Sequence, residues 1–282
     1  MAQGPQPISS IKHPAVAETR RAIGQLGKDQ PTHFLVDGHK LVGQALAARA
    51  PVDKVFLLAA DDCPADPELF QIARETGAEC FALSKGIFFR LLGLGYETSV
   101  SVLATVRIAP RSPLELLASP LGDTCLSFGE NIQDPRNVGV MIRNVDAAGL
   151  SGALFTNSSA DPYSRGSVRS STGSIFRAPL GLLDSDGVVL RQLKSEGVRL
   201  IGSSAHAATA LWDADLTGPC ALVFGNETGG LSAETEALCD TMITIPMPGA
   251  AHSFNVTVAH GIILCEAARQ RRAATKSSTS RT

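Results

Sequence analysis

Residues 244–272, TIPMPGAAHSFNVTVAHGIILCEAARQRR, place two prolines between a short apolar run and a helical pattern. Proline fixes φ and lacks a backbone N–H, so Pro246 and Pro248 bend the chain and leave neighbouring carbonyls without sheet partners. From Asn255 onward, apolar residues recur every three or four positions, which predicts a helix that opens near Ser253. The segment therefore predicts a strand, a stiff loop whose backbone can meet a ligand, and a helix with more than one apolar face.

Two other segments repeat the order of strand, polar loop and helix. Residues 130–149 read ENIQDPRNVGVMIRNVDAAG, and residues 222–232 read LVFGNETGGLS. Taken alone, Ser253 and Asn255 are explained as caps of unpaired helix donors, and the glycines of the second segment as a tight turn. That segment has neither the GxGxxG of a dinucleotide site nor the GK[ST] of a P-loop. The repeated build nevertheless favours a functional role over capping alone.

The three segments resemble, in order and spacing, the three motifs of the SpoU/TrmH group of SPOUT RNA 2′-O-ribose methyltransferases. The resemblance covers the C-terminal half of the chain. It implies an α/β SPOUT domain with a deep trefoil knot, which ordinary connection rules would not predict. It also implies S-adenosylmethionine as the cofactor, RNA as the substrate and a homodimer in which the partner completes each RNA site.

The resemblance further assigns cofactor contacts. On the matching positions of this sequence they are Ser203, Gly225, Ile245, Met247 and Phe254. Phe254 stands where the family usually has leucine, and both side chains are apolar. Val145 likewise replaces a usual alanine in the first motif, which is a change in packing. The resemblance requires no metal.

The same resemblance assigns activation of the ribose hydroxyl to Arg143. We predict five catalytic residues in all, which are Arg143, Asn137, Glu227, Ser253 and Asn255. We interpret Arg143 as the group that stabilises developing negative charge or positions the adjacent phosphate, because a free guanidinium hardly loses its proton. The other four orient the reacting partners. Gly139 lies four residues before Arg143, so its missing side chain is expected to leave open space for a ribose or a phosphate.

Residues 164–179, SRGSVRSSTGSIFRAP, are rich in hydroxyl groups and arginines, which are common phosphate partners. This stretch resembles the family segment between the first two motifs. We therefore expect Arg165 and Arg169 to contact RNA. For Arg169 an ion pair with a nearby carboxylate is the alternative.

The first hundred residues alternate strands and helices, which predicts a small α/β sandwich domain over residues 1–108. FLVDGHKLVGQAL, residues 34–46, resembles the ribosomal-protein-like substrate-binding domain that precedes many methyltransferases of this group, with Asp37 where the family usually has glutamate. That likeness favours ribosomal RNA over transfer RNA. Residues 109–120, APRSPLELLASP, are predicted as the linker, and residues 121–282 as the SPOUT domain with a basic, mobile tail from about residue 270.

Composition adds limits to this interpretation. The formal net charge of −2 is not the basic excess of a generic nucleic-acid binder, so RNA binding must depend on a local basic surface. No signal peptide and no membrane-spanning run is visible, which predicts a soluble cytoplasmic protein. The six cysteines show no zinc spacing and are predicted to be reduced thiols, and they are Cys63, Cys80, Cys125, Cys220, Cys239 and Cys265.

Three functions remain open at this point. The favoured one is a ribosomal RNA 2′-O-methyltransferase, either housekeeping or protective against a ribosome-targeting antibiotic. The second is the same reaction on transfer RNA. The third is a catalytically idle RNA-binding protein with a vestigial cofactor pocket, which is disfavoured because every motif residue expected to act is present.

Overall fold

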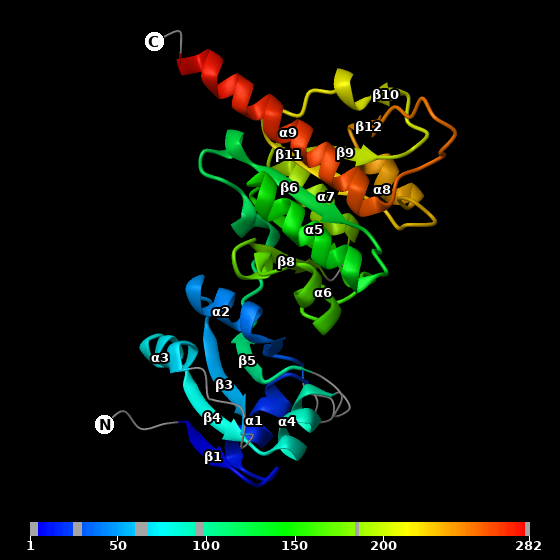
Figure 1. Cartoon of the computed structure of the whole chain (residues 1–282). Coiled ribbons are helices and arrows are strands. Elements are labelled where there is room, and N and C mark those ends of the chain that lie inside the picture. The colour runs from blue at the N-terminus through cyan, green and yellow to red at the C-terminus, as the bar shows by residue number, and fades with distance from the viewer. Residues whose placement is uncertain (1–4, 25–29, 60–66, 94–98, 184–185, 280–282) are drawn as a thin grey trace. The chain divides into compact units, whose positions relative to one another are not determined.

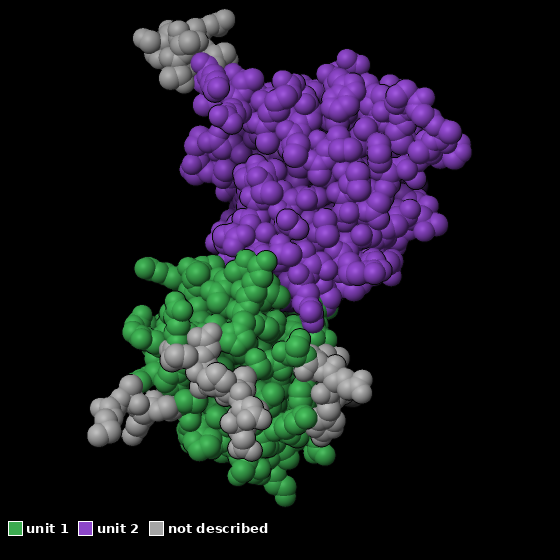
Figure 2. Space-filling model, in the orientation of Figure 1, with its two compact units in different colours: residues 1–109, 163–165 green, residues 110–162, 166–282 purple. Residues whose placement is uncertain are grey.

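The computed structural model describes residues 5–24, 30–59, 67–93, 99–183 and 186–279 (Figure 1). The chain divides into two compact units (Figure 2). Unit 1 is Met1–Ala109 with Tyr163–Arg165, and unit 2 is Pro110–Pro162 with Gly166–Thr282. The division after Ala109 falls next to the predicted end of the N-terminal domain. Cys63 lies outside the described residues.

Unit 1 is built on a five-stranded sheet with the order β1-β4-β3-β5-β2. The strands are β1 (Gln6–Ile8), β2 (His33–Asp37), β3 (Val52–Leu58), β4 (Glu79–Leu83) and β5 (Val102–Arg107), and β5 runs antiparallel to both of its neighbours. The helices are α1 (Pro14–Ala22), α2 (His39–Ala47), α3 (Pro67–Glu75) and α4 (Lys85–Leu92). Apolar residues of α1 and α4 form one core cluster with Phe56 and Phe81 of the sheet. The alternation of strands and helices that the sequence predicted is present.

Unit 2 contains a seven-stranded parallel sheet with the order β10-β12-β9-β11-β6-β7-β8. The strands are β6 (Cys125–Gly129), β7 (Gly152–Thr156), β8 (Leu180–Leu183), β9 (Arg199–Ser203), β10 (Thr209–Ala210), β11 (Cys220–Phe224) and β12 (Thr241–Thr244). The helices are α5 (Pro135–Ala148), α6 (Arg165–Ser170), α7 (Asp186–Ser195), α8 (Ala233–Leu238) and α9 (Val256–Thr279). Every residue of β6, β7 and β11 is buried, as expected for parallel strands covered on both faces.

All of the predicted linker after Ala109 is part of unit 2. Residues Pro113–Leu116 form a short 3₁₀ helix, and the Glu115 carboxylate accepts a hydrogen bond of 2.7 Å from the Ser112 backbone N–H. Leu116 is buried in the same apolar cluster as Leu126 and Leu154. Residues 113–116 therefore pack on the sheet and are not a free connection between domains.

Helix α5 lies within the segment 130–149 that was predicted to contain a helix, and it begins at Pro135. Asp134 caps its first turn by accepting a hydrogen bond of 2.8 Å from the Arg136 backbone N–H, and Pro135 occupies the first helical position. Gly149 ends the helix with a left-handed φ of 68°.

The open space expected beside Gly139 is absent, so that prediction is wrong. A Cβ atom at this position would lie 2.3 Å from the Ser167 carbonyl oxygen and 2.7 Å from the Ser170 Cβ. Glycine is thus required because α6 packs directly against α5, and no room for a ribose or a phosphate exists there.

Helix α9 differs from the prediction at both ends. It begins at Val256, and Asn255 caps it by accepting a hydrogen bond of 2.9 Å from the Thr257 backbone N–H, so the predicted opening at Ser253 is too early. It continues to Thr279, which corrects the mobile tail predicted from about residue 270. Gln270 is tied to the body of the unit, since the Leu216 N–H donates to its Oε1 at 2.8 Å. Among the described residues, no helix combines the length and the apolar character that crossing a bilayer requires.

Candidate active site

The carboxyl ends of the parallel strands meet at one edge of the unit 2 sheet, and a cleft of about 460 Å³ lies there. Loops after β9, β11 and β12 and the first turn of α9 form its walls. The lining includes Ser203, Ser204, Ala205, His206, Phe224, Gly225, Asn226, Glu227, Thr228, Gly229, Gly230, Leu231, Glu236, Ile245, Met247, His252, Ser253, Phe254, Val256 and Ala259.

The loop after β11 is closed by its own backbone. Asn226 and Gly230 exchange two backbone hydrogen bonds of 2.9 and 3.0 Å, and the Asn226 side-chain oxygen accepts from the N–H groups of Thr228 and Gly229, each at 2.9 Å. A Cβ atom at Gly225 would lie 2.2 Å from the Gly230 carbonyl carbon. The loop therefore folds back onto Gly225 so closely that only glycine fits.

Glu227 joins the second motif to the first. Its carboxylate accepts a hydrogen bond of 2.7 Å from the Asn137 side-chain amide and one of 3.3 Å from the Gln133 backbone N–H. Burial alone would raise the pKa of Glu227, but the Asn137 amide and nearby backbone N–H groups together hold that pKa below its ordinary value. The carboxylate is thus ionised at neutral pH and places a negative charge in the cleft.

The structure brings all five predicted cofactor residues to this cleft, namely Ser203, Gly225, Ile245, Met247 and Phe254. Of the predicted catalytic residues, Glu227 and Ser253 line it as well. Asn137 reaches it through Glu227, and Asn255 instead serves as the cap of α9. Arg143 does not line the cleft. It is exposed on α5 and makes no hydrogen bond or ion pair with any residue that the structure describes.

Comparison with known proteins places this arrangement in a family. The family model described as the SpoU rRNA Methylase family matches residues 128–265. The 23S rRNA (uridine(2479)-2′-O)-methyltransferase of Streptomyces viridochromogenes is 40% identical over 207 residues, which are 71% of this chain and 71% of that protein. The chain belongs to the SpoU rRNA methylase family.

Two further relatives of this SpoU family chain match almost its whole length. An uncharacterised tRNA/rRNA methyltransferase of Mycolicibacterium smegmatis is 30% identical over 268 residues, covering 92% of this chain and 85% of that protein. The crystal structure of the SpoU methyltransferase AviRb from Streptomyces viridochromogenes, in complex with the cofactor AdoMet, superimposes with a TM-score of 0.76 at 28% identity. It covers 91% of this chain and 99% of that one. The mixed α/β fold is therefore that of SpoU methyltransferases.

A buried hydrogen-bond network in unit 2, formed by Ser127, His260 and Asn144, was not predicted from the sequence. His260 of α9 is fully buried, and its two ring nitrogens lie 2.8 Å from Ser127 Oγ and 3.2 Å from the Asn144 side-chain amide. Asn144 also donates to the Thr257 carbonyl at 3.1 Å. Burial lowers the pKa of His260 to about 3, so the imidazole is neutral, accepts from Asn144 and donates to Ser127. This network ties α5 to the first turns of α9 at Asn144, the residue that follows Arg143.

No sequence signal indicated that network. His260 stands in an otherwise apolar helical pattern, and an asparagine on a helix such as Asn144 is expected to face solvent. Within the described residues, no group of three or more His, Cys, Asp and Glu side chains is arranged to hold a metal ion.

The two predicted RNA contacts lie on or beside α6. Arg165 forms an ion pair of 2.6 Å with Asp37, whose side chain is buried within unit 1. The contact of Arg165 with RNA stays a prediction, and in this structure its guanidinium pairs with the Asp37 carboxylate. Arg169 is exposed. The hydroxyls of Ser167 and Ser171 donate to the carbonyls of Asp161 and Val168, which shows that much of this polar stretch holds its own fold together.

Proposed function

We propose that this chain transfers a methyl group from S-adenosylmethionine to a ribose 2′-hydroxyl of ribosomal RNA. The observation that carries the proposal is the meeting of all five predicted cofactor residues in one cleft at the carboxyl edge of a SpoU-type sheet. Relatives give it further support. The protein that is 40% identical is named a 23S rRNA 2′-O-methyltransferase, and a 36% identical protein of Shewanella oneidensis is named a 23S rRNA (guanosine-2′-O-)-methyltransferase.

The cleft suits the cofactor in size and charge. Its volume of about 460 Å³ lies in the range of roughly 300 to 1,000 Å³ that holds ligands of this size. Ionised Glu227 and the nearby Glu236 make the cleft negative, which favours a cationic ligand. Gly225 lets the backbone of its loop approach without a side chain in the way, and Ile245, Met247 and Phe254 offer apolar surface. When bound, S-adenosylmethionine supplies an electrophilic methyl group on a positively charged sulfur.

The residues around the cleft prepare the ribose for that methyl. An alcohol is a weak nucleophile, so the site must hold the hydroxyl in line and offset the negative charge that develops as its proton leaves. The positively charged Arg143 guanidinium offsets this negative charge or holds the adjacent phosphate. Glu227, fixed by Asn137, and Ser253 orient the ribose. The hydrogen-bond network around His260 holds α5 against the first turns of α9, so that these groups stay aligned.

A homodimer follows from the position of Arg143 in this mechanism. Arg143 does not line the cleft of its own chain, whereas Phe254 and Val258 beside that cleft are 43% and 47% exposed. A second copy that covers these apolar side chains brings its own Arg143 to the cleft. Static light scattering is expected to give twice the mass of one chain at micromolar concentration, and a monomer would contradict the proposal.

Complementation tests the exchange of Arg143 between subunits. Co-expression of Arg143→Ala with Gly225→Ala yields mixed dimers that pair an intact cleft with an intact arginine. We expect such a mixture to regain about a quarter of the normal activity, because half of the dimers are mixed and each has one working site of two. Two inactive parents whose mixture stays inactive would show that Arg143 acts within its own chain.

Four finer features belong to the same proposal. The chain forms a deep trefoil knot, which is supported by the path of residues 245–255 from β12 near one side of the sheet to α9, which packs on α5 (Figure 1). Unit 1 is the ribosomal-protein-like RNA-binding domain, and Arg169 of unit 2 contacts RNA. The protein works in the cytoplasm, where its substrate is.

The decisive experiment offers labelled S-adenosylmethionine with ribosomal RNA and with transfer RNA, then maps the modified nucleotide. We expect label on ribosomal RNA, on a ribose 2′-oxygen. Label on transfer RNA alone would favour the second substrate, for which the name of the Mycolicibacterium smegmatis relative leaves room. Failure to bind the cofactor in calorimetry, together with no methyl transfer to either RNA, would indicate an idle RNA-binding protein with a vestigial cofactor pocket.

A further inference from the structure

Two cysteines lie side by side at the amino ends of strands in the unit 2 sheet, whereas the cleft lies at the carboxyl ends. Cys125 begins β6 and Cys220 begins β11, and they are register partners on adjacent parallel strands. Their sulfur atoms are 3.8 Å apart, and both residues are buried. Neither takes part in the proposed methyl transfer.

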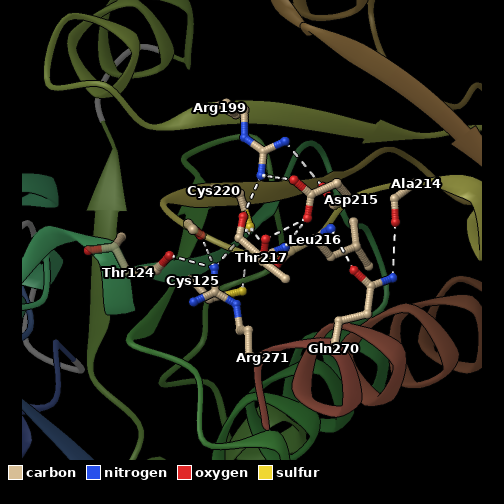
Figure 3. A network of polar contacts seen from close by, with 11 residues as sticks. Thr124, Cys125, Arg199, Ala214, Asp215, Leu216, Thr217, Cys220, Gln270 and Arg271 are labelled. Atoms are coloured by element: carbon tan, nitrogen blue, oxygen red, sulfur yellow. Dashed lines mark hydrogen bonds and ion pairs between the residues drawn. The ribbon is translucent and has the colours of Figure 1, made fainter. Parts of the chain in front are cut away.

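A cation from α9 stands beside one of the two sulfurs (Figure 3). Arg271 Nη2 lies 3.4 Å from Cys220 Sγ. The same guanidinium donates to the carbonyls of Asp123 at 3.2 Å and Thr124 at 2.9 Å, and also to that of Gly218. Carbonyl oxygens thus hold the charge in place but do not neutralise it.

The surrounding charges favour a thiolate at Cys220. Arg199 is the other cation near this sulfur, and its own carboxylate partner, Asp215, lies 3.6 Å from its guanidinium. A hydrogen bond from the Cys125 thiol, followed by the charge of Arg271, lowers the pKa of Cys220 against the opposing effect of burial. The same contact raises the pKa of Cys125. Of the two thiols, Cys220 is therefore the one that loses its proton more readily, and the thiolate is the reactive form of cysteine.

We propose that Cys125 and Cys220 form a redox-active dithiol that closes to a disulfide when hydrogen peroxide oxidises it. The Cys220 thiolate attacks one peroxide oxygen and becomes a sulfenic acid, and the other oxygen leaves as hydroxide and takes up a proton. The Cys125 sulfur then attacks the sulfenic sulfur, its proton and the departing hydroxyl form water, and an S–S bond results. Two thiols lose two electrons and two protons in all, and one peroxide becomes two waters.

The strand geometry permits this bond. Neighbouring strands are about 4.8 Å apart, which lies within the range of about 4.4 to 6.8 Å between the Cα atoms of disulfides. The sulfurs must approach from 3.8 Å to about 2.05 Å. Because β6 and β11 are central strands, we expect the sheet to restrain this movement. Because both sulfurs are buried, we expect that only a small oxidant such as hydrogen peroxide can reach them. Oxidised glutathione is too large to reach sulfurs that are buried in the sheet.

Other thiols provide internal comparisons. Burial raises the pKa of Cys239 to about 11 and also raises that of Cys80, so both are poor nucleophiles at neutral pH. Cys265 is exposed on α9 and reports on oxidation that depends on access alone.

The test treats the full-length protein with hydrogen peroxide, blocks free thiols with iodoacetamide and maps disulfides by mass spectrometry of a non-reducing digest. We expect a cross-linked peptide pair that joins Cys125 to Cys220 and has lost two hydrogens, and we expect oxidised glutathione not to form it. In Cys125→Ser, Cys220 should stop at a sulfenic acid, which dimedone traps once the peroxide-treated protein is unfolded in its presence. Oxidation of Cys265 while Cys125 and Cys220 stay reduced would overturn the proposal.

Two arginine variants test the role of the Arg271 guanidinium. Arg271→Met should slow disulfide formation about three- to tenfold, because the thiolate fraction falls as the pKa of Cys220 rises. Arg269→Met is the matched control, since Arg269 pairs with Glu266 on the same helix, and its rate should be normal. Equal rates in both variants would contradict the assignment to Arg271. Should Arg271→Met fail to fold, trapping of Cys220 in Cys125→Ser decides the proposal.

Discussion

Replacing Arg143 by alanine lowers the rate of methyl transfer at saturating RNA and cofactor by about 100-fold or more, the usual effect of removing a group that stabilises charge in the transition state. The guanidinium is exposed and pairs with no described residue, so its loss leaves no buried charge and should cost little stability. Single-turnover transfer of a labelled methyl group to ribosomal RNA measures the effect directly.

Two further variants make this result specific. Arg143→Lys keeps the charge but loses the planar fork, and we expect an intermediate rate. Arg191→Ala removes an arginine from a largely exposed ion pair of 2.9 Å with Glu234, and its rate should be unchanged. Calorimetry should show normal cofactor binding in all three. Near-normal turnover by Arg143→Ala would refute the role given to this residue.

Local patterns predicted the elements that bear the site, because their signals are contained in a few neighbouring residues. Asp134, Pro135 and Gly149 mark the ends of α5 at positions where capping chemistry requires them. The order of the strands was not predictable in this way. β12 pairs between β9 and β10, and β11 between β9 and β6, so neighbours in the sheet are far apart in sequence. Only the family resemblance indicated the fold.

The errors have a common physical cause, which is contact between distant segments. Gly139 appeared to leave open space, but α6 fills it. The partner of Arg165 was not foreseen, because the Asp37 carboxylate lies 128 positions earlier in the chain. His260 carried no signal because its partners, Ser127 and Asn144, lie on other elements. Periodicity and capping describe one segment at a time, and these contacts join two.

Gly225→Ala is expected to weaken S-adenosylmethionine binding about tenfold or more and to abolish methyl transfer at ordinary cofactor concentrations. The added Cβ would lie 2.2 Å from the Gly230 carbonyl carbon and 2.3 Å from the Leu231 backbone nitrogen. Backbone atoms cannot rotate aside, so the paired hydrogen bonds between Asn226 and Gly230 must open. That movement displaces Glu227 and the wall of the cleft, and overpacking of this kind costs about 1 to 3 kcal/mol. Isothermal titration of cofactor into the variant gives the affinity.

Gly229→Ala is the matched control in the same loop. Its added Cβ would meet nothing closer than the Asn226 side-chain oxygen at 3.7 Å, an ordinary contact, and Gly229 does not have a left-handed φ. Because no described atom has to move for this Cβ, the loop should keep its fold and its cofactor affinity should stay within about twofold of normal. Thermal unfolding separates a local effect from a general one, because a variant that retains most of its melting temperature has lost only the loop. Normal cofactor binding by Gly225→Ala with this loop displaced would mean that the cofactor lies elsewhere, since a ligand held by that backbone cannot tolerate its movement.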